Sequence, residues 1–599
     1  MPAPVSHAPS NDLRLTTGIV LGSGLLALFL YAHPYGGMHA DAEVYALQAL
    51  SRLYPESLRG DMFFRFGSQD SYTVFPPLHA WLIGLLGLDQ SAWLLSRAFL
   101  IALAAGALLL ARACMQRQQA WLALALFILI PGAYGPHNVF AYGENVLTPR
   151  TLAEALSLLS LWLALSARWR ASLATLAVAL LLHPIMALPA LLCVAALRAP
   201  ARAPLLLGGG AALGLATATV LAVLWPLGPI QIMDHDWRAT LELLTPFLMA
   251  QQWWLPDWQR SVVPLATLAV AVIALAPGRG RLLAATALAI GAAGLALLLY
   301  SSFVAPIVLL VQGQAWRWTW LARAVAVLLL VPTGAALWRR GPNGVAVLAL
   351  LAVGWYGSED ALGLEAALCA VAFAVLEVGA ARPIRLLWAG GGALALLFGA
   401  GIVHLIGFTA RLQFAAGAIA VWWLVVGARR AWLTALAALG TAAACGVQLA
   451  ATLNAPLEPG YDAVTRALVP WQHRIGADQT VLNFGDGAWP WVALHRQSYF
   501  GNVGILFSRR TAMAMRARND ELQQRAGSDL AWFSAGRSAD RPPPSLGTLR
   551  RLCGAPDLDF IVAPVSYPVP HALSNAPAPF DSIYLYDCRD LLADGDDHA

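Results

Sequence analysis

The sequence predicts an all-α polytopic membrane domain followed by a small α/β domain. Of the 599 residues, 59% are hydrophobic and only 12% are charged, whereas soluble globular proteins carry about 25% charged residues. Apolar runs recur from Leu13 to about Ala451, and each is long enough to cross about 30 Å of hydrocarbon as a helix. After Asn454 long polar stretches take over. We therefore expect a transmembrane domain at 1–453 and an extracytoplasmic α/β domain at 454–599.

The composition also excludes several classes of protein. An ordinary cytosolic enzyme and a disordered chain would both be less apolar. The formal net charge is +5, but the arginines stand in short groups between apolar runs, which is typical of the cytoplasmic ends of transmembrane helices and not of a nucleic-acid binder. The six cysteines contain no C-x-x-C pattern, so neither a disulfide framework nor a zinc site is indicated.

Arginine pairs set the predicted orientation. They stand at 112/117, 168/170, 198/202, 279/281, 339/340, 382/385 and 429/430. The positive-inside rule places all of them in the cytoplasm, unless one pair is on the other side. The first run, Leu13–Tyr31, has no A-x-A cleavage site and is expected to be a retained first helix with a cytoplasmic N-terminus. We predict about 13 spans in a bacterial-type inner membrane.

The later predicted spans follow from the apolar runs between these pairs. They are 119–136, 151–168, 204–226, 261–277, 282–301, 318–338, 343–358, 360–380, 384–408, 411–428 and 431–452. Two further segments need special geometry. The segment 74–88 is short and opens with two prolines, so we expect a half-inserted or surface helix. The segment 172–197 must break near His183-Pro184, as re-entrant or tilted helices do where they line a cavity.

The tail carries its own secondary-structure signals. Short β-like pieces lie at 480–484, 559–563 and 582–586, and RRTAMAMRARNDELQQR at 509–525 predicts a surface helix. Cys553 and Cys588 fall in this predicted extracytoplasmic domain, where an oxidising compartment permits a disulfide. The pair is therefore either bonded or free. The other cysteines are expected to be small core residues.

The first predicted outer loop places two acids just after the first helix. Asp41 and Glu43 are followed by Val44, Leu47 and Leu50 at near-helical spacing, which predicts an amphipathic helix at the membrane interface. Two acids that are two residues apart cannot share one helix face, so at most one points into a pocket. Asp41 is either a general base or metal ligand, or it merely caps the helix.

The order of these features resembles the GT-C superfamily of polytopic glycosyltransferases. The D-x-E element at 41–43, the amphipathic helix, FPPLHAWL at 75–82 and LLSRAFLIALAAGALLLAR at 94–112 follow one another as in that family, and the resemblance covers about residues 13–200. It implies a polyprenyl-phosphate-linked sugar as donor, and it places a first-loop acid at the catalytic centre, here Asp41 with Glu43 beside it. A W-W-D-type acceptor motif is not found, so the chain does not resemble an oligosaccharyltransferase.

The second predicted outer loop offers substrate-binding candidates. His137, Tyr142, Glu144 and Arg150 lie in GPHNVFAYGENVLTPR. Arg150 precedes an apolar helix and presents the donors that suit a lipid phosphate. The alternative is an i,i+4 pair of Arg150 with Glu154 that anchors the helix.

His183 and Arg317 complete the candidates. His183 lies at the predicted helix break, either as a core histidine or as a pocket residue. Arg317 stands among tryptophans, where a cation binds a phosphate headgroup or simply anchors the helix. Asp234-His235-Asp236 resembles a metal-site fragment, but three adjacent residues cannot all face one ion in regular structure. No cofactor is therefore predicted with certainty, and a divalent cation is an option.

Together these features predict a membrane glycosyltransferase. It would move a sugar from a polyprenyl-phosphate donor to an envelope glycan, lipid or protein acceptor at the outer face, within a membrane of lipids and without nucleic acid. The alternatives are a transporter or flippase, and a non-catalytic envelope scaffold with a degenerate core. Convergence of Asp41, His137, Arg150, His183 and Arg317 on one cavity favours the enzyme, and scatter favours the scaffold.

Overall fold

The computed structural model describes residues 33–198, 231–357, 361–379, 460–484, 488–501, 508–530 and 543–596, together with Leu25 and Phe29. Four predicted spans, at 204–226, 384–408, 411–428 and 431–452, and most of the first apolar run lie outside the described residues.

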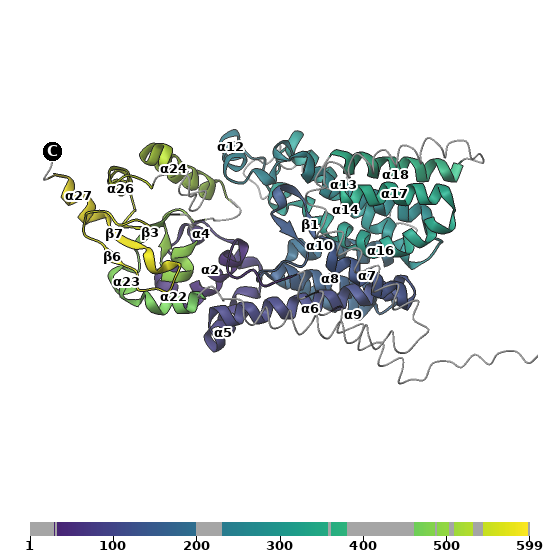
Figure 1. The fold of residues 1–599 in the computed structure, drawn as a ribbon, viewed down its shortest axis with the longest axis horizontal. Coiled ribbons are helices and arrows are strands. Elements are labelled where there is room, and N and C mark those ends of the chain that lie inside the picture. Colours follow the sequence, from purple (N-terminus) through teal and green to yellow (C-terminus); the bar gives the residue numbers. More distant parts are fainter. Residues whose placement is uncertain are drawn as a thin grey trace, which may run out of the picture.

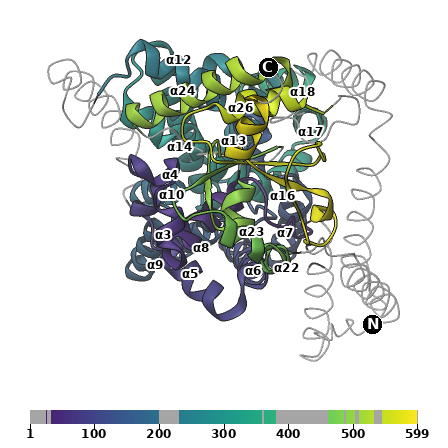
Figure 2. The ribbon, with the colours of Figure 1, turned by 90° about the vertical axis from the view of Figure 1, so that its left-hand side faces the viewer.

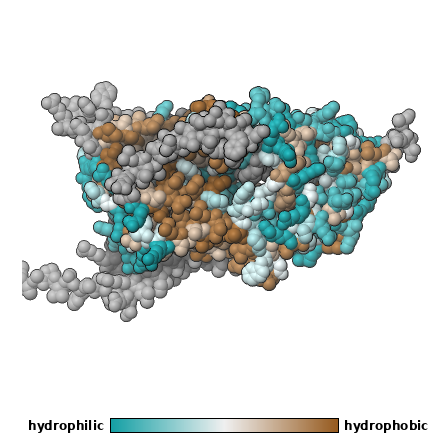
Figure 3. All heavy atoms as spheres, turned by 180° about the vertical axis from the view of Figure 1, so that it is seen from behind, coloured by the Kyte–Doolittle hydropathy of each residue, from teal (hydrophilic) through white to brown (hydrophobic). Residues whose placement is uncertain are grey.

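An apolar helical body forms one end of the molecule (Figure 1). Its helices are α6 (Leu88–Cys114), α7 (Arg117–Leu129), α8 (Pro149–Leu165), α9 (Trp169–Leu182), α10 (Pro184–Arg198), α13 (Leu255–Ala274), α14 (Arg279–Phe303), α15 (Val308–Gly313), α16 (Thr319–Arg339), α17 (Pro342–Tyr356) and α18 (Ala361–Gly379). Figure 3 shows apolar side chains over this body and hydrophilic ones over the C-terminal region.

Three stretches of described helix are long and apolar enough to cross a membrane. They are Leu88–Cys114, Arg279–Phe303 and Val308–Arg339, which is consistent with a membrane protein. Other apolar helices are shorter, for example α17 and α9, and α7 ends at Leu129 because Ile130 is extended. The described residues therefore do not confirm a count of about 13 spans.

The two irregular segments behave as the prolines predict. Helix α9 ends at Leu182, His183 is extended, and α10 begins at Pro184. Proline lacks an amide hydrogen and disfavours helical backbone in the residue before it, so the break at His183-Pro184 is confirmed. Helix α5 (Phe75–Leu86) has 12 residues with prolines in its first turn, which confirms a short helix.

Between the helical body and the C-terminal region lie α2 (Asp41–Leu53), α3 (Pro55–Leu58), α4 (Met62–Arg65) and α12 (His235–Leu244). The predicted helix after the first run is therefore present. Most of α2 is buried within the protein. Leu47 and Leu50 pack in one core with Trp237 and Trp491. Helix α2 is thus largely covered by protein.

The C-terminal region is built on a five-stranded sheet with the order β4-β3-β5-β7-β6. Its strands are β3 (Thr480–Asn483), β4 (Gln497–Ser498), β5 (Phe560–Ala563), β6 (Ala572–Leu573) and β7 (Tyr584–Asp587). Its helices are α22 (Tyr461–Ala467), α23 (Val469–Arg474), α24 (Arg509–Ala526), α26 (Leu546–Cys553) and α27 (Cys588–Asp596). Strand β3 runs parallel to β4 and β5, and β7 runs antiparallel to β5 and β6.

Several tail predictions are confirmed. The three predicted strands correspond to β3, β5 and β7, and the predicted surface helix corresponds to α24. Cys553 and Cys588 are joined in a disulfide, which decides between the two alternatives left open by the sequence.

Specific polar contacts join the C-terminal region to the first loop. Buried Asp61, the N-cap of α4, accepts hydrogen bonds from Trp491 Nε1 at 2.7 Å and Ser498 N at 2.9 Å. Asp89 accepts from the first amides of α22, and Asp462 accepts from the first amides of α6. Figure 2, seen along the long axis, shows the C-terminal sheet and helices in front of the helical body.

Candidate functional site

A small β-ribbon brings the second loop to the end of the helical body that faces α2. Strand β1 (Ala133–Tyr134) pairs antiparallel with β2 (Phe140–Ala141), and the 3₁₀ turn η2 (Pro136–Asn138) joins them. Gly135 has a φ of 68°, and a Cβ there would lie 2.3 Å from the Trp316 ring, so only glycine fits. The ribbon is therefore held against the segment that carries Arg317.

Asp41 is the first residue of α2, and its carboxylate forms an ion pair with Arg150 Nη1. The residue before it, Ala40, is the N-cap, and no side chain caps this helix. The alternative that Asp41 merely caps α2 is therefore not what the structure shows. The Asp41 side chain is 31% exposed, whereas that of Arg150 is 4% exposed, so Asp41 lies on the solvent side of the pair.

Glu144 is the second partner of Arg150. Arg150 Nη2 lies 2.8 Å from Glu144 Oε1, and Nε donates to Glu144 Oε2 at 3.0 Å. The Thr148 hydroxyl also donates to Glu144. Glu154 instead accepts a hydrogen bond from the Gly143 amide at 3.0 Å, so the i,i+4 alternative with Arg150 is not observed.

Arg317 lies in the 3₁₀ turn η6 (Ala315–Trp318), just before α16, and is only 4% exposed. Its Nε donates to Gln314 Oε1 at 2.6 Å. Among the residues that the structure describes, no carboxylate lies within ion-pair distance of its guanidinium. A buried cation without an anionic partner is costly, and it is therefore a candidate for binding an anion.

Both guanidinium groups contact one aromatic ring. The guanidinium carbon of Arg317 is 4.1 Å from the Phe140 centroid, and that of Arg150 is 4.7 Å away. Such contacts stabilise a cation by about 0.5–2 kcal/mol. We call Asp41, Phe140, Glu144, Arg150 and Arg317 the ion-pair cluster.

Electrostatics inside the ion-pair cluster favour ionised Asp41. Burial alone would raise the pKa of Asp41, but the Arg150 guanidinium, its hydrogen bond and the more distant Arg317 lower the pKa below 3.8. Asp41 is therefore a carboxylate at neutral pH. The ion-pair cluster then holds two guanidinium groups and the carboxylates of Asp41 and Glu144.

Phe140 and Tyr45 also belong to the site, although neither was a candidate from the sequence. Tyr45 follows Asp41 by one helical turn, is 4% exposed, and its ring lies 6.0 Å from the Arg150 guanidinium carbon. Burial raises the pKa of Tyr45 to about 12, so its hydroxyl stays protonated and able to donate. The i,i+4 spacing from Asp41 is a signal that could have found Tyr45.

His183 lies beside the ion-pair cluster without a direct contact to it. The charges of Arg317 and Arg150 both act on its imidazole, and its Nδ1 accepts a hydrogen bond from the Met186 amide at 3.4 Å. The helix break thus places His183 next to the arginines. Glu43, in contrast, is buried in α2 and does not make the ion pair to Arg150.

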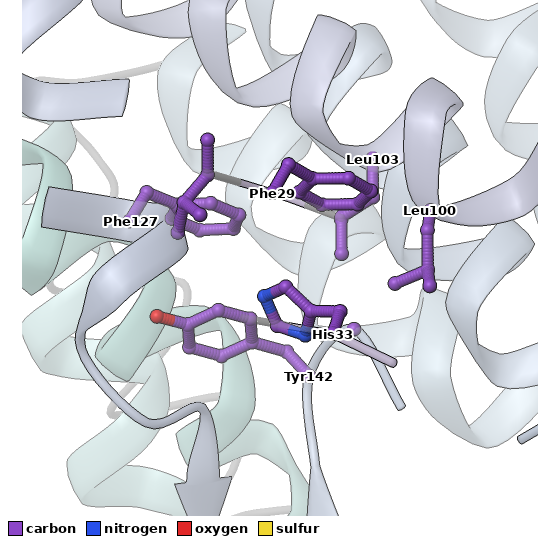
Figure 4. A pocket seen from close by; sticks show the side chains of 8 residues that line it. Phe29, His33, Leu100, Leu103, Phe127 and Tyr142 are labelled. Atoms are coloured by element: carbon purple, nitrogen blue, oxygen red, sulfur yellow. The ribbon is translucent and has the colours of Figure 1, made fainter. Parts of the chain in front are cut away.

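His137 and Tyr142 lie elsewhere. The His137 ring stacks on Trp254 at 4.8 Å, with Nε2 2.9 Å from the Gln252 carbonyl oxygen. Tyr142 stacks on Phe127 and lines a small, mostly apolar cavity together with His33 (Figure 4). Asp41, Glu144, Arg150 and Arg317 therefore converge, His183 is adjacent, and His137 and Tyr142 are separate.

The described residues offer little for a metal ion. Asp234 caps α12 and pairs with Arg509 of α24, whereas His235 and Asp236 are 94% and 72% exposed. In the described part of the chain, no group of three or more His, Cys, Asp or Glu side chains is arranged to hold a metal.

Comparisons with known proteins assign no function to this site, so we interpret it from its geometry. No protein-family model matches the chain, and no curated protein matches it.

Proposed function

We propose that the chain is a membrane glycosyltransferase that moves a sugar from a polyprenyl-phosphate donor to an acceptor. The observation that carries the proposal is Arg317, a buried cation with no carboxylate partner among the described residues, beside Arg150 and Asp41. A phosphate is the anion that guanidinium groups bind best, because its oxygens accept several charge-assisted hydrogen bonds. The apolar helices nearby suit a prenyl chain.

The chemistry balances within the ion-pair cluster. The acceptor hydroxyl oxygen forms a bond to the anomeric carbon of the sugar, and the bond from that carbon to the phosphate oxygen breaks. The electron pair goes to the leaving phosphate, which gains one negative charge that Arg150 and Arg317 stabilise. The hydroxyl proton goes to the Asp41 carboxylate, which acts as the base. The carboxylate thus loses the charge that the phosphate gains.

Sidedness is part of the same proposal. About 13 spans, a cytoplasmic N-terminus and an extracytoplasmic C-terminal domain would place the ion-pair cluster at the outer face of a bacterial-type inner membrane. This arrangement is similar to that of the GT-C enzymes. Support comes from the contacts of α2 and α4 with the C-terminal region, which put the ion-pair cluster at the end of the body that carries this region.

The test compares envelope glycans and lipid-linked sugars by mass spectrometry in cells with and without the protein. Asp41→Asn keeps the size of the side chain but removes the base, so we expect loss of the transferred sugar with unchanged protein level and thermal unfolding. Asp236→Asn, at an acid that is 72% exposed, is the matched control and should retain full transfer. A fully active Asp41→Asn protein would remove the assignment of Asp41 as base.

A further inference from the structure

We infer that a phosphate oxygen of the donor binds Arg150 at the position that the Asp41 carboxylate occupies without ligand. The donor thereby displaces Asp41, which is then free to serve as the base. The inference rests on the proposed function, and it adds an order of events. The donor binds first, and only then is the carboxylate available to an acceptor hydroxyl.

The two carboxylates on Arg150 are not equivalent. Glu144 takes the Nε and Nη2 side of the guanidinium, is also bonded by the Thr148 hydroxyl, and its side chain is only 10% exposed. Asp41 takes Nη1 alone, and its side chain is 31% exposed. Glu144 is therefore the fixed partner of Arg150, and Asp41 is the partner that a ligand from solvent can replace.

Charge counting favours replacement over simple addition. Without ligand, the two guanidinium groups equal the carboxylates of Asp41 and Glu144 in number, although both carboxylates contact Arg150 and the polar partner of Arg317 is the neutral amide of Gln314. A phosphodiester that joined them would bring one more negative charge into a buried site. Unbalanced buried charge is expensive, so the ligand and Asp41 compete for the same donors. Asp41, whose side chain is the more exposed of the two carboxylates on Arg150, can leave at the lower cost, because water then solvates its carboxylate.

The same displacement changes the chemistry of Asp41. While it is paired, the guanidinium groups stabilise the carboxylate and make it a weak base. A bound phosphate neutralises Arg150 and Arg317, so the released carboxylate binds a proton more readily. The Asp41 carboxylate therefore becomes an effective base for the acceptor hydroxyl or for water only after the donor phosphate has bound.

The test measures the equilibrium binding of a radiolabelled polyprenyl phosphate to the full-length protein in nanodiscs. If Asp41 competes for Arg150, its removal strengthens binding even though it abolishes transfer. We expect Asp41→Asn and Asp41→Ala to bind about 10-fold more tightly than the unmodified protein, which equals about 1.4 kcal/mol. Asp236→Asn should leave the affinity unchanged. Competition by inorganic phosphate shows whether the headgroup alone suffices or the prenyl chain is required.

The outcomes separate this inference from the proposed function. Equal or weaker binding by both Asp41 variants, with clear binding by the unmodified protein, overturns the displacement and leaves the transferase proposal standing. Binding that is absent from every form overturns both. Thermal unfolding of each variant confirms that the measured affinities belong to folded protein.

Discussion

Buried and partly buried carboxylates occur in two regions of this molecule, and their hydrogen-bonding and charge partners differ between the two. Where the C-terminal region meets α4 and the start of α6, Asp61, Asp89 and Asp462 accept hydrogen bonds from backbone amides and the Trp491 indole. In the ion-pair cluster, Asp41 and Glu144 face guanidinium groups. The carboxylates of the first set have their hydrogen-bond partners within the protein itself. The second set keeps a partly exposed carboxylate, and beside it lies Arg317, which has no carboxylate partner in the part of the chain that the structure describes.

This difference between the two regions indicates which of them can bind a ligand. A carboxylate that caps a helix stabilises the fold and needs nothing further. A buried guanidinium that is not paired with a carboxylate carries a continuing cost until an anion binds. The ion-pair cluster is therefore the region whose energetics a ligand can improve, and the contacts around Asp61 are the region whose energetics a ligand would not change.

The largest expected loss in the free energy of unfolding comes from Arg150→Ala, because Arg150 is the residue that both carboxylates of the ion-pair cluster contact. It leaves Glu144 and Asp41 without their cation, and loss of one partner of a buried pair costs about 3–5 kcal/mol. Denaturant or thermal unfolding in detergent measures the change. Arg52→Ala is the matched control, because its pair with Asp70 spans 3.5 Å and its side chain is 33% exposed, so about 1 kcal/mol or less is expected. Equal losses for both would contradict a special role for Arg150.

A smaller loss of stability is expected from Asp61→Asn, which tests the region where the carboxylate is held by hydrogen bonds of the protein itself. The carboxylate accepts from Trp491 Nε1 and Ser498 N on one oxygen and from Phe63 N on the other. An asparagine has one accepting oxygen and an NH2 group that only donates, so we expect a loss of about 1–3 kcal/mol. Binding of polyprenyl phosphate should not change. A change in that binding equal to the change caused by substitution in the ion-pair cluster would argue against two independent regions.

The loss at Asp61 should also depend on pH. Burial raises the pKa of Asp61 above 3.8, against the lowering effect of its hydrogen bonds. A carboxyl with a raised pKa in the folded state binds a proton more readily than in the unfolded state. Its stabilisation is therefore fully present below pH 3.8 and falls as pH rises through the folded-state pKa. The free-energy difference between the unmodified protein and Asp61→Asn should grow as the pH is lowered from 7 towards 4.

Much of the local structure could be predicted from the sequence. The break at His183-Pro184 and the short α5 follow from proline chemistry, and β3, β5 and β7 follow from short apolar runs. The burial of α2 could not be predicted, because an amphipathic pattern does not reveal that Trp491, far along the chain, covers its second side.

The candidate site was predictable only in part. Asp41, Arg150 and Arg317 were singled out by charge near apolar helices, but their meeting depends on the ribbon that places Phe140 between the two arginines. His137 and Glu144 stand in the same polar loop, yet the turn at 136–138 directs His137 towards Trp254 instead. The side that each loop residue faces depends on tertiary contacts, which spacing alone does not reveal.

The most direct test of the central claim is the affinity of Arg317→Gln for a radiolabelled polyprenyl phosphate in nanodiscs. Arg317 has no carboxylate partner among the described residues, so its removal should not expose an unpaired buried anion, and thermal unfolding should stay the same or rise. We predict a loss of affinity of roughly 10- to 100-fold, as expected for one charge-assisted contact of about 1.4–2.8 kcal/mol. Unchanged affinity in a folded Arg317→Gln protein would contradict the claim that this buried arginine binds the donor phosphate.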